Sequence, residues 1–87
     1  MEIIRVKIDN KEYEMYSLLV LGRQIVVASY DLNRQIENMI DQGRYNEVEY
    51  IDSTYDYYLP YEVDHTDENE IRDSIESVMR EDYGDIL

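Results

Sequence analysis

Tyrosine and carboxylate side chains are interleaved in one segment of this chain, residues 48–64 (VEYIDSTYDYYLPYEVD). The segment holds five of the ten tyrosines and contains no lysine or arginine. Carboxylates form charge-assisted hydrogen bonds with guanidinium groups, and aromatic rings stack on the same groups. These residue types therefore favour contact with an arginine-rich surface over catalysis.

Residues for the common catalytic mechanisms are scarce elsewhere. His65 is the only histidine and there is no cysteine, which excludes a Cys-His nucleophile pair and leaves a serine triad with one candidate base. We expect His65 to be an exposed loop residue. The chain has no glycine-rich phosphate loop, and its spacing singles out no pair of carboxylates as an acid and a base. We predict that the protein is not an enzyme and uses no cofactor.

One cluster, residues 64–70 (DHTDENE), contains metal-ligating residue types. It lacks the ligand order and the glycine of an EF-hand loop. Acidic residues are also common where helices begin, because they interact favourably with the helix dipole. We therefore predict weak association with divalent cations there and no specific metal site.

The negative charge is concentrated in the second half of the chain. Residues 1–44 carry seven acidic and six basic residues, whereas residues 45–87 carry fourteen acidic residues and only Arg72 and Arg80 as bases. A formal net charge of −13 opposes direct binding to DNA or RNA, which requires lysine and arginine at the phosphates. The excess instead favours solubility or a positively charged protein partner.

Length and composition predict a single domain over residues 1–87. The longest apolar runs have only four residues and no basic-then-apolar leader follows Met1, so we expect neither a membrane span nor export. The absence of cysteine fits a reducing compartment. We expect a cytoplasmic protein.

Apolar residues alternate with polar ones in the first part of the chain. Residues 2–9 alternate through Ile4, Val6 and Ile8, residues 12–21 begin by alternating and end continuously apolar, and residues 24–30 are rich in β-branched side chains. Turns are expected at Asn10 and Gly22. The pattern predicts a three-stranded antiparallel meander.

Two segments show helical spacing. Residues 31–42 have Asp31 as the expected N-cap, Gly43 as the expected residue after the C-cap, and a predicted apolar stripe of Leu32, Ile36, Met39 and Ile40. Residues 67–82 begin with the capping-box pair Asp67 and Glu70, and Gly84 is expected to end that helix. The stripe of the second helix consists of Ile71, Ile75, Val78 and Met79.

The stretch between the helices is expected to be extended. Val48 and Tyr50 alternate with Glu47, Glu49 and Ile51. Residues 52–54 (DST) are expected to turn the chain into a short strand over residues 55–61. Pro60 should place that strand at an edge or end it. The expected fold is a small α+β domain, with the meander, one or two further strands in an antiparallel sheet, and two amphipathic helices on one sheet face.

Alternation in the predicted strand divides its side chains between two faces. Tyr55, Tyr57, Leu59 and Tyr61 share one face, and Asp56 and Tyr58 share the other. Both faces cannot be core. We therefore expect at least two of the four tyrosines to be exposed.

The second predicted helix is rich in carboxylates. It is roughly 24 Å long at about 1.5 Å per residue, and its seven acidic residues give one per roughly 3.4 Å, about the axial charge density of one DNA strand. A plainer interpretation is that Glu68 with Arg72 and Glu76 with Arg80 form i,i+4 pairs on an ordinary solvated helix. Both interpretations remain open at the level of the sequence.

A short, cysteine-free, acidic and tyrosine-rich chain without an enzymatic motif resembles the DNA-mimicking inhibitors encoded by phages and mobile elements, including anti-CRISPR and anti-restriction proteins. The resemblance rests on composition and on residues 50–76 (YIDSTYDYYLPYEVDHTDENEIRDSIE). It implies stoichiometric binding to a nuclease in the bacterial host cytoplasm, blocking the groove that recognises a PAM or holds DNA.

The predicted partner is thus a basic nucleic-acid-binding protein, such as a Cas nuclease or a restriction enzyme. The alternative is an immunity-like, antitoxin-like or housekeeping acidic module that binds a basic protein unrelated to DNA. The residues predicted to contact the partner are Asp52, Tyr55, Asp56, Tyr57, Tyr58, Glu62, Asp64, Asp67, Glu70, Asp73 and Glu76.

Overall fold

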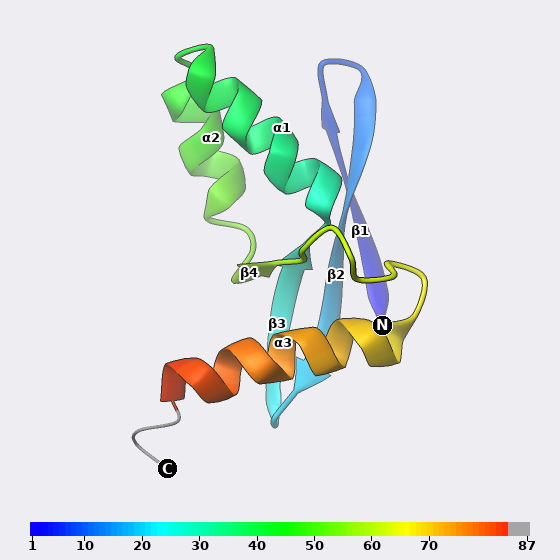
Figure 1. Cartoon of the computed structure of the whole chain (residues 1–87). Coiled ribbons are helices and arrows are strands. Elements are labelled where there is room, and N and C mark those ends of the chain that lie inside the picture. The colour runs from blue at the N-terminus through cyan, green and yellow to red at the C-terminus, as the bar shows by residue number, and fades with distance from the viewer. Residues whose placement is uncertain (84–87) are drawn as a thin grey trace.

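The computed structural model describes residues 1–83, with side-chain positions through residue 82. The elements are, in chain order, β1 (Glu2–Ile8), β2 (Lys11–Val20), β3 (Arg23–Ala28), α1 (Tyr30–Asp41), α2 (Tyr45–Asp52), β4 (Tyr57–Tyr58) and α3 (Glu68–Tyr83) (Figure 1). The sheet has the order β1-β2-β3-β4. The predicted α+β class and the N-terminal meander are confirmed.

Two details of the predicted architecture are wrong. The sheet is mixed, because β4 pairs with β3 in parallel, Val27 with Tyr57 and Ala28 with Tyr58. The described part of the chain also contains three helices where two were expected. Two intervening helices carry the chain away from the end of β3 and back again, and this long connection lets β4 run in the same direction as β3.

Two-residue turns set the register of the meander. Asp9 and Asn10 have φ of 51° and 69°, and Leu21 and Gly22 have φ of 49° and 76°. Positive φ at both central positions is the geometry whose twist matches that of a β-hairpin. The turns therefore fix β2 against β1 and β3.

The central strand β2 changes its buried face halfway along its length. Tyr13 and Met15 are buried on one face, and Tyr16, Leu18 and Val20 are buried on the other. Met15 and Tyr16 are consecutive, so β2 is covered on both faces where the change occurs. Each face of the sheet is consequently apolar over only one half, and two separate cores form.

The first core lies beside the β1–β2 hairpin. Its helical part comes from α1, through Leu32, Ile36 and Met39, and from Ile51 of α2. Val48 of α2 packs against its edge. Ile40 of α1, predicted to be part of the buried stripe, is exposed.

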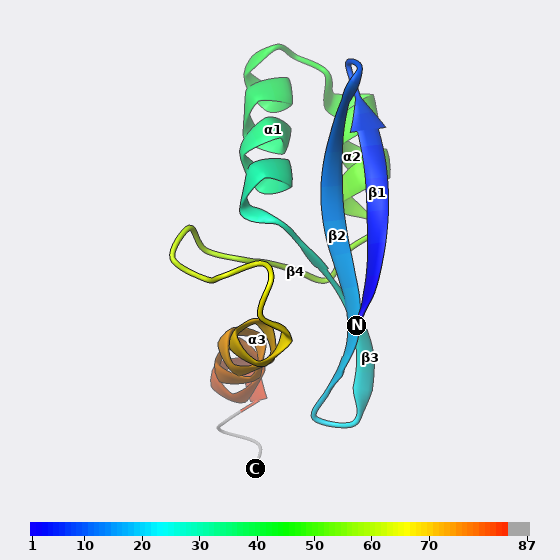
Figure 2. The same ribbon diagram turned by 90° about the vertical axis from the view of Figure 1, so that its right-hand side faces the viewer.

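The second core joins α3 to the other half of the sheet. Ile71, Ile75 and Met79 of α3 pack with Leu59 and with residues on the opposite face of β2. Figures 1 and 2 show α1 and α2 beside the β1–β2 hairpin, whereas α3 crosses the other end of the sheet. The expectation that both predicted helices share one sheet face is therefore wrong, because β2 offers each face an apolar surface at a different end.

The segment predicted to be extended at residues 47–51 is helix α2. Val48 and Ile51, one helical turn apart, both face the first core, whereas Tyr50 is exposed. The DST segment lies at the end of this helix and does not join two strands. The Ser53 hydroxyl donates to the carbonyl of Tyr50 at 2.7 Å, and the Thr54 hydroxyl donates to the carbonyl of Ile51. Packing in the first core thus decides the conformation.

The helix ends partly match the predictions. Ser29, not Asp31, is the N-cap of α1, and its Oγ accepts a hydrogen bond from the Leu32 N–H at 3.2 Å. Gly43 follows the C-cap with φ of 76°, as expected. Gly84, the expected end of the last helix, lies outside the described residues.

The α3 helix begins next to the expected Asp67 cap. Asp67 Oδ1 accepts from the N–H groups of Asn69 and Glu70 at 3.0 and 3.4 Å. In a full capping box the Glu70 side chain would accept from the Asp67 N–H. Here the Asp67 N–H donates instead to the carbonyl of Asp64 at 3.2 Å. Val78, predicted to be in the buried stripe of this helix, is 38% exposed.

Within residues 1–83, no helix combines the length and the apolar character that a membrane crossing requires.

Candidate partner-binding surface

The tyrosines of residues 55–61 differ in exposure. Tyr58 and Tyr61 are 57% and 77% exposed, which confirms that at least two of the four face outward. Tyr55 and Tyr57 are half-buried, and Leu59 is fully buried. Tyr61 departs from the expected alternation because β4 ends at Tyr58, and its ring instead packs edge-on against Tyr30, with centroids 5.5 Å apart.

Asp56 holds β4 at the sheet edge. Its backbone N–H donates to the carbonyl of Val26 at 2.8 Å, and its Oδ2 accepts from the Val26 N–H at 3.0 Å. The Leu59 N–H donates to the carbonyl of Ala28 at 3.0 Å. Asp56 therefore has a structural role, although its side chain is exposed.

Asp52 lies at the end of α2 and is exposed. Burial raises the pKa of the Tyr55 hydroxyl, and a hydrogen bond with the Asp52 carboxylate raises that pKa further. The negative charge of Asp52 is thus next to a neutral tyrosine that packs against the first core. This pair connects the tyrosine segment with α2.

The loop before α3 contains one solvent-facing and two internally bonded carboxylates. Asp64 Oδ1 accepts from the N–H and the hydroxyl of Thr66 at 2.9 and 2.7 Å, and these bonds lower the pKa of Asp64. Asp67 is the helix cap. Glu62 is exposed.

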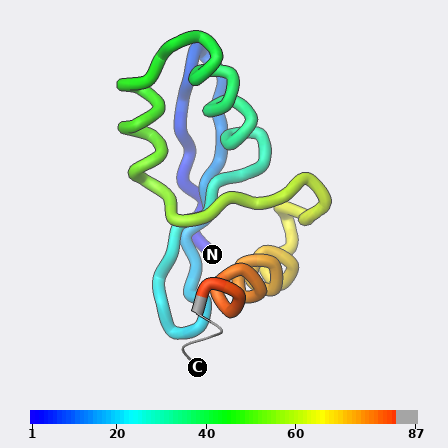
Figure 3. Tube along the Cα trace, turned by 60° about the vertical axis from the view of Figure 1, so that its left-hand side comes forward, coloured from blue at the N-terminus to red at the C-terminus, as the bar shows by residue number. Residues whose placement is uncertain are grey.

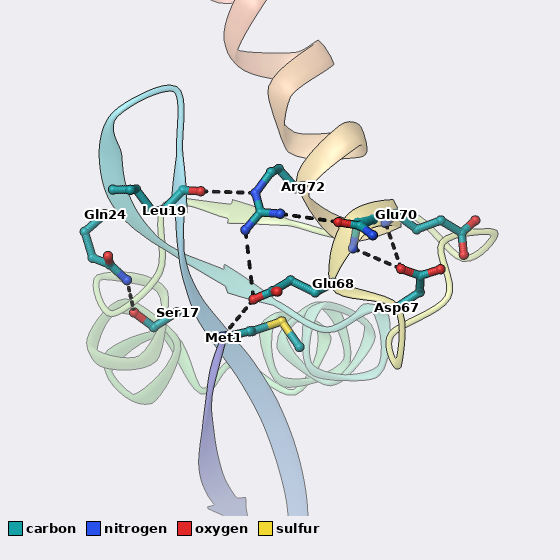
Figure 4. Close-up of polar contacts among 9 residues, drawn as sticks. Met1, Ser17, Leu19, Gln24, Asp67, Glu68, Glu70 and Arg72 are labelled. Carbon is teal, nitrogen blue, oxygen red and sulfur yellow. Dashed lines mark hydrogen bonds and ion pairs between the residues drawn. The ribbon is translucent and has the colours of Figure 1, made fainter.

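One side of α3 is attached to the strands. The N-terminal ammonium of Met1 lies 2.7 Å from Glu68 Oε1 and lowers the pKa of that carboxyl. Arg72 donates through Nε to the carbonyl of Leu19 at 3.3 Å and lies 4.0 Å from Glu68 Oε1. Figure 4 shows this network between α3 and the strands, with the Glu70 side chain directed away from it.

The outer side of α3 carries carboxylates of two kinds. Glu76 pairs with Arg80 at 2.7 Å, as the plainer interpretation of the helix predicts. Glu70 and Asp73 are exposed and form no ion pair within residues 1–83. The i,i+4 pairs of the plainer interpretation are thus present, and Glu70 and Asp73 lie outside them.

These positions divide the eleven predicted contact residues into three groups. Internal bonds involve Tyr55, Asp56, Asp64, Asp67 and Glu76. Tyr57 is half-buried against the second core. We call the remaining five the acidic surface: Tyr58, Glu62, Glu70 and Asp73, together with Asp52, which is exposed although its carboxylate bonds the Tyr55 hydroxyl.

A hollow of about 340 Å³ separates β4 from α3. We call it the β4–α3 pocket, and its lining residues are Asp56, Tyr57, Tyr58, Pro60, Ser74 and Val78. It brings three predicted contact residues together with two α3 residues that the sequence analysis did not assign to the surface. The residues around β4 and the two α3 residues lie far apart along the chain. No sequence pattern therefore connects them.

The expectation that His65 is simply an exposed loop residue is wrong. His65 is half-buried, and its Nδ1 lies 3.3 Å from the hydroxyl of Tyr16, with the two rings edge-on at 5.9 Å. Burial, followed by the charges of Glu14 and Asp31, raises the pKa of Tyr16 to about 12. His65 thus attaches the loop before α3 to β2.

No group of three or more histidine or carboxylate side chains within residues 1–83 is placed to hold a metal ion.

A larger hollow of about 590 Å³ lies between β1 and α2 and was missed by the sequence analysis. At one end Arg44 donates to both oxygens of Asp9 at 2.7 and 3.1 Å and to Glu47. These bonds lower the pKa of Asp9. Figure 3 shows α2 beside the hairpin strands. The only signal in the sequence is Arg44 directly after Gly43, where the helix ends. That position does not indicate Asp9 as the partner of Arg44.

Comparisons with protein-family models, with curated proteins and with solved structures find no match to this chain.

Proposed function

We propose that the protein is a non-enzymatic inhibitor that acts in the cytoplasm of a bacterial host. Its acidic surface binds the basic groove of a nuclease that otherwise holds DNA, as in an anti-CRISPR or anti-restriction protein. A carboxylate array replaces the phosphates, and the exposed tyrosine replaces the stacking surface of a base.

One observation carries the proposal. The exposed carboxylates Glu70 and Asp73 lack ion-pair partners within residues 1–83, although the arginines Arg72 and Arg80 lie on the same helix. Both arginines pair with other glutamates. The helix therefore presents unneutralised negative charge to solvent, which a groove of lysine and arginine can complement.

The position of Tyr58 gives further support. Tyrosine supplies a large contact area with few rotatable bonds and is enriched among residues that dominate binding energy. Tyr58 is exposed on β4, which is fixed to β3 both by backbone pairing and by the bond from the Val26 N–H of β3 to Asp56. Its backbone is thus already ordered before a partner binds.

The test is capture of the target from bacteria with active defence nucleases, followed by competition with that nuclease's DNA. We expect the protein and DNA to exclude each other from the nuclease. A ternary complex of nuclease, DNA and this protein would contradict occupation of the groove. Capture of a basic protein that does not bind DNA would instead favour the immunity-like or antitoxin-like alternative.

A matched pair of triple variants tests the surface itself. Glu62→Arg, Glu70→Arg and Asp73→Arg together should weaken nuclease binding at least about 100-fold, equivalent to about 2.7 kcal/mol. Glu2→Arg, Glu37→Arg and Asp41→Arg make the same change in net charge at exposed positions of the first half. Equal losses in the two variants would show that only net charge matters and would reject the surface.

A further inference from the structure

We propose that the β4–α3 pocket receives an arginine side chain of the partner. This inference rests on the proposed function, because it names the group that the partner places against the acidic surface. It goes further by assigning a defined site to one residue type.

The size and shape of the pocket suit a single side chain. About 340 Å³ is at the low end of the volumes of small-ligand sites. The walls come from β4 with the following Pro60 on one side and from Ser74 and Val78 of α3 on the other. A side chain can therefore enter between the two elements, whereas a helix or a strand cannot.

The lining matches the two parts of an arginine side chain. Val78 and Pro60 are apolar and suit its aliphatic stem. Tyr57 and Tyr58 offer aromatic rings on which a planar guanidinium can stack. Asp56 supplies a carboxylate, of which Oδ2 bonds the Val26 N–H and Oδ1 is outside that bond.

Charge favours a cation as the occupant. Asp56 is the only charged residue of the lining, and no lysine or arginine belongs to it. Asp73 directly precedes Ser74 on α3 and adds a second carboxylate next to the α3 wall of the pocket in the chain. The arginines of α3 are engaged on other sides of the helix, Arg72 with Leu19 and Arg80 with Glu76.

The same chemistry distinguishes arginine from lysine. An ammonium group is compact and strongly hydrated, and it has no planar surface to stack on a ring. Arginine can stack on Tyr58 and bond Asp56 at once. Val78, the member of the predicted α3 stripe that core packing leaves 38% exposed, forms part of the pocket wall beside these groups.

The experiment compares hexa-arginine and hexa-lysine peptides, which carry equal charge, by amide NMR titration of the full chain at low salt. We expect the arginine peptide to bind at least about fivefold more tightly, with the largest shifts at Tyr57, Tyr58, Ser74 and Val78. Equal affinities, or shifts that leave the pocket unchanged, would overturn the proposal.

Three variants locate the binding. Asp56→Asn keeps an oxygen acceptor for the Val26 N–H but removes the charge, Tyr58→Ala removes an exposed ring, and Val78→Trp fills the pocket. Each should reduce arginine-peptide affinity to the level of the lysine peptide, whereas Glu37→Gln on α1 should leave the preference unchanged. Retained arginine preference in folded Asp56→Asn and Tyr58→Ala proteins would also reject the pocket.

This experiment requires no nuclease, so its failure is separable from that of the proposed function. If the protein competes with DNA for the nuclease but shows no preference for the arginine peptide, only the pocket is rejected. Arginine preference with a ternary nuclease–DNA complex supports the pocket and rejects groove occupation.

Discussion

The two ends of the molecule use their charged residues differently. At the hairpin end, Arg44 contacts both Asp9 and Glu47, and the β1–β2 register places Arg5 opposite Glu14 and Lys7 opposite Glu12. At the α3 end, several carboxylates are bonded internally, and the acidic surface faces solvent. A net charge therefore says little until the residues that are already paired are separated from those that are available to a partner.

The strongest test of this comparison concerns whether the two ends fold together. Leu32→Ala in the first core and Leu59→Ala in the second should each lower the free energy of unfolding by about 2–5 kcal/mol, because both side chains are fully buried. Urea unfolding followed by circular dichroism measures both. If the ends form one cooperative unit, the two variants keep the wild-type m-value. A lower m-value in only one of them would show that its end unfolds separately.

A smaller effect is expected at the helix starts. Ser29→Ala at α1 and Asp67→Ala at α3 each remove a side-chain acceptor from first-turn N–H groups, which should cost about 1 kcal/mol. Thermal unfolding compares them directly. Asp67→Ser keeps the cap while removing a charge from the acidic end, and it should recover most of the loss. No recovery would assign the effect to charge and not to capping.

The edge of the sheet should respond by a similar or smaller amount. Asp56→Ala removes the acceptor for the Val26 N–H and should cost about 0.5–1.5 kcal/mol, since the exposed N–H can bond water instead. Asp56→Asn should be closer to wild type. Urea unfolding of the two variants measures the difference, and equal stabilities would show that Oδ2 does not help to hold β4.

The smallest expected effects have opposite signs at the two ends. Asp9→Asn should lower the melting temperature at pH 7, because it removes a carboxylate bonded to Arg44. Asp73→Asn should leave it unchanged or raise it slightly, because it relieves repulsion among like charges.

The pH dependence of Asp9→Asn provides the check. The folded-state pKa of Asp9 lies below its ordinary value of 3.8, so its stabilisation is present above that value and is lost as the pH falls through the folded pKa. Melting temperatures of wild type and Asp9→Asn should therefore converge in acid. A constant difference from pH 7 to pH 2 would contradict this assignment.

The parts of the fold that could be predicted are those with local causes. Alternation predicted the meander, the spacing of Ile71, Ile75 and Met79 predicted α3, and Pro60 predicted the end of β4. Helix α2 was missed because the short alternation around Val48 and Tyr50 fits a strand as well as it fits one turn of a helix. Only the burial of Val48 and Ile51 against the first core distinguishes the two.

The sequence predicted the kinds of residue on the candidate surface but not which individual residues belong to it. Acidity and exposed tyrosine in the second half were visible in the chain. Asp56, Asp64 and Asp67 have the same chemistry as Glu62, but their bonds to Val26, Thr66 and the start of α3 give them structural roles. Ser74 and Val78 could not be assigned to a pocket, because the opposite wall is remote in sequence.

The sequence by itself determined the charge asymmetry, the meander and most members of the two helical stripes, because composition, turn residues and periodicity act over a few residues. Tertiary structure decided which carboxylates remain available, which tyrosines face solvent and where the helices pack. The physical reason lies in β2, which reverses its buried face at Met15 and Tyr16 and so directs α1 and α3 to different cores. That arrangement places α3 across from β4 and creates the pocket between them.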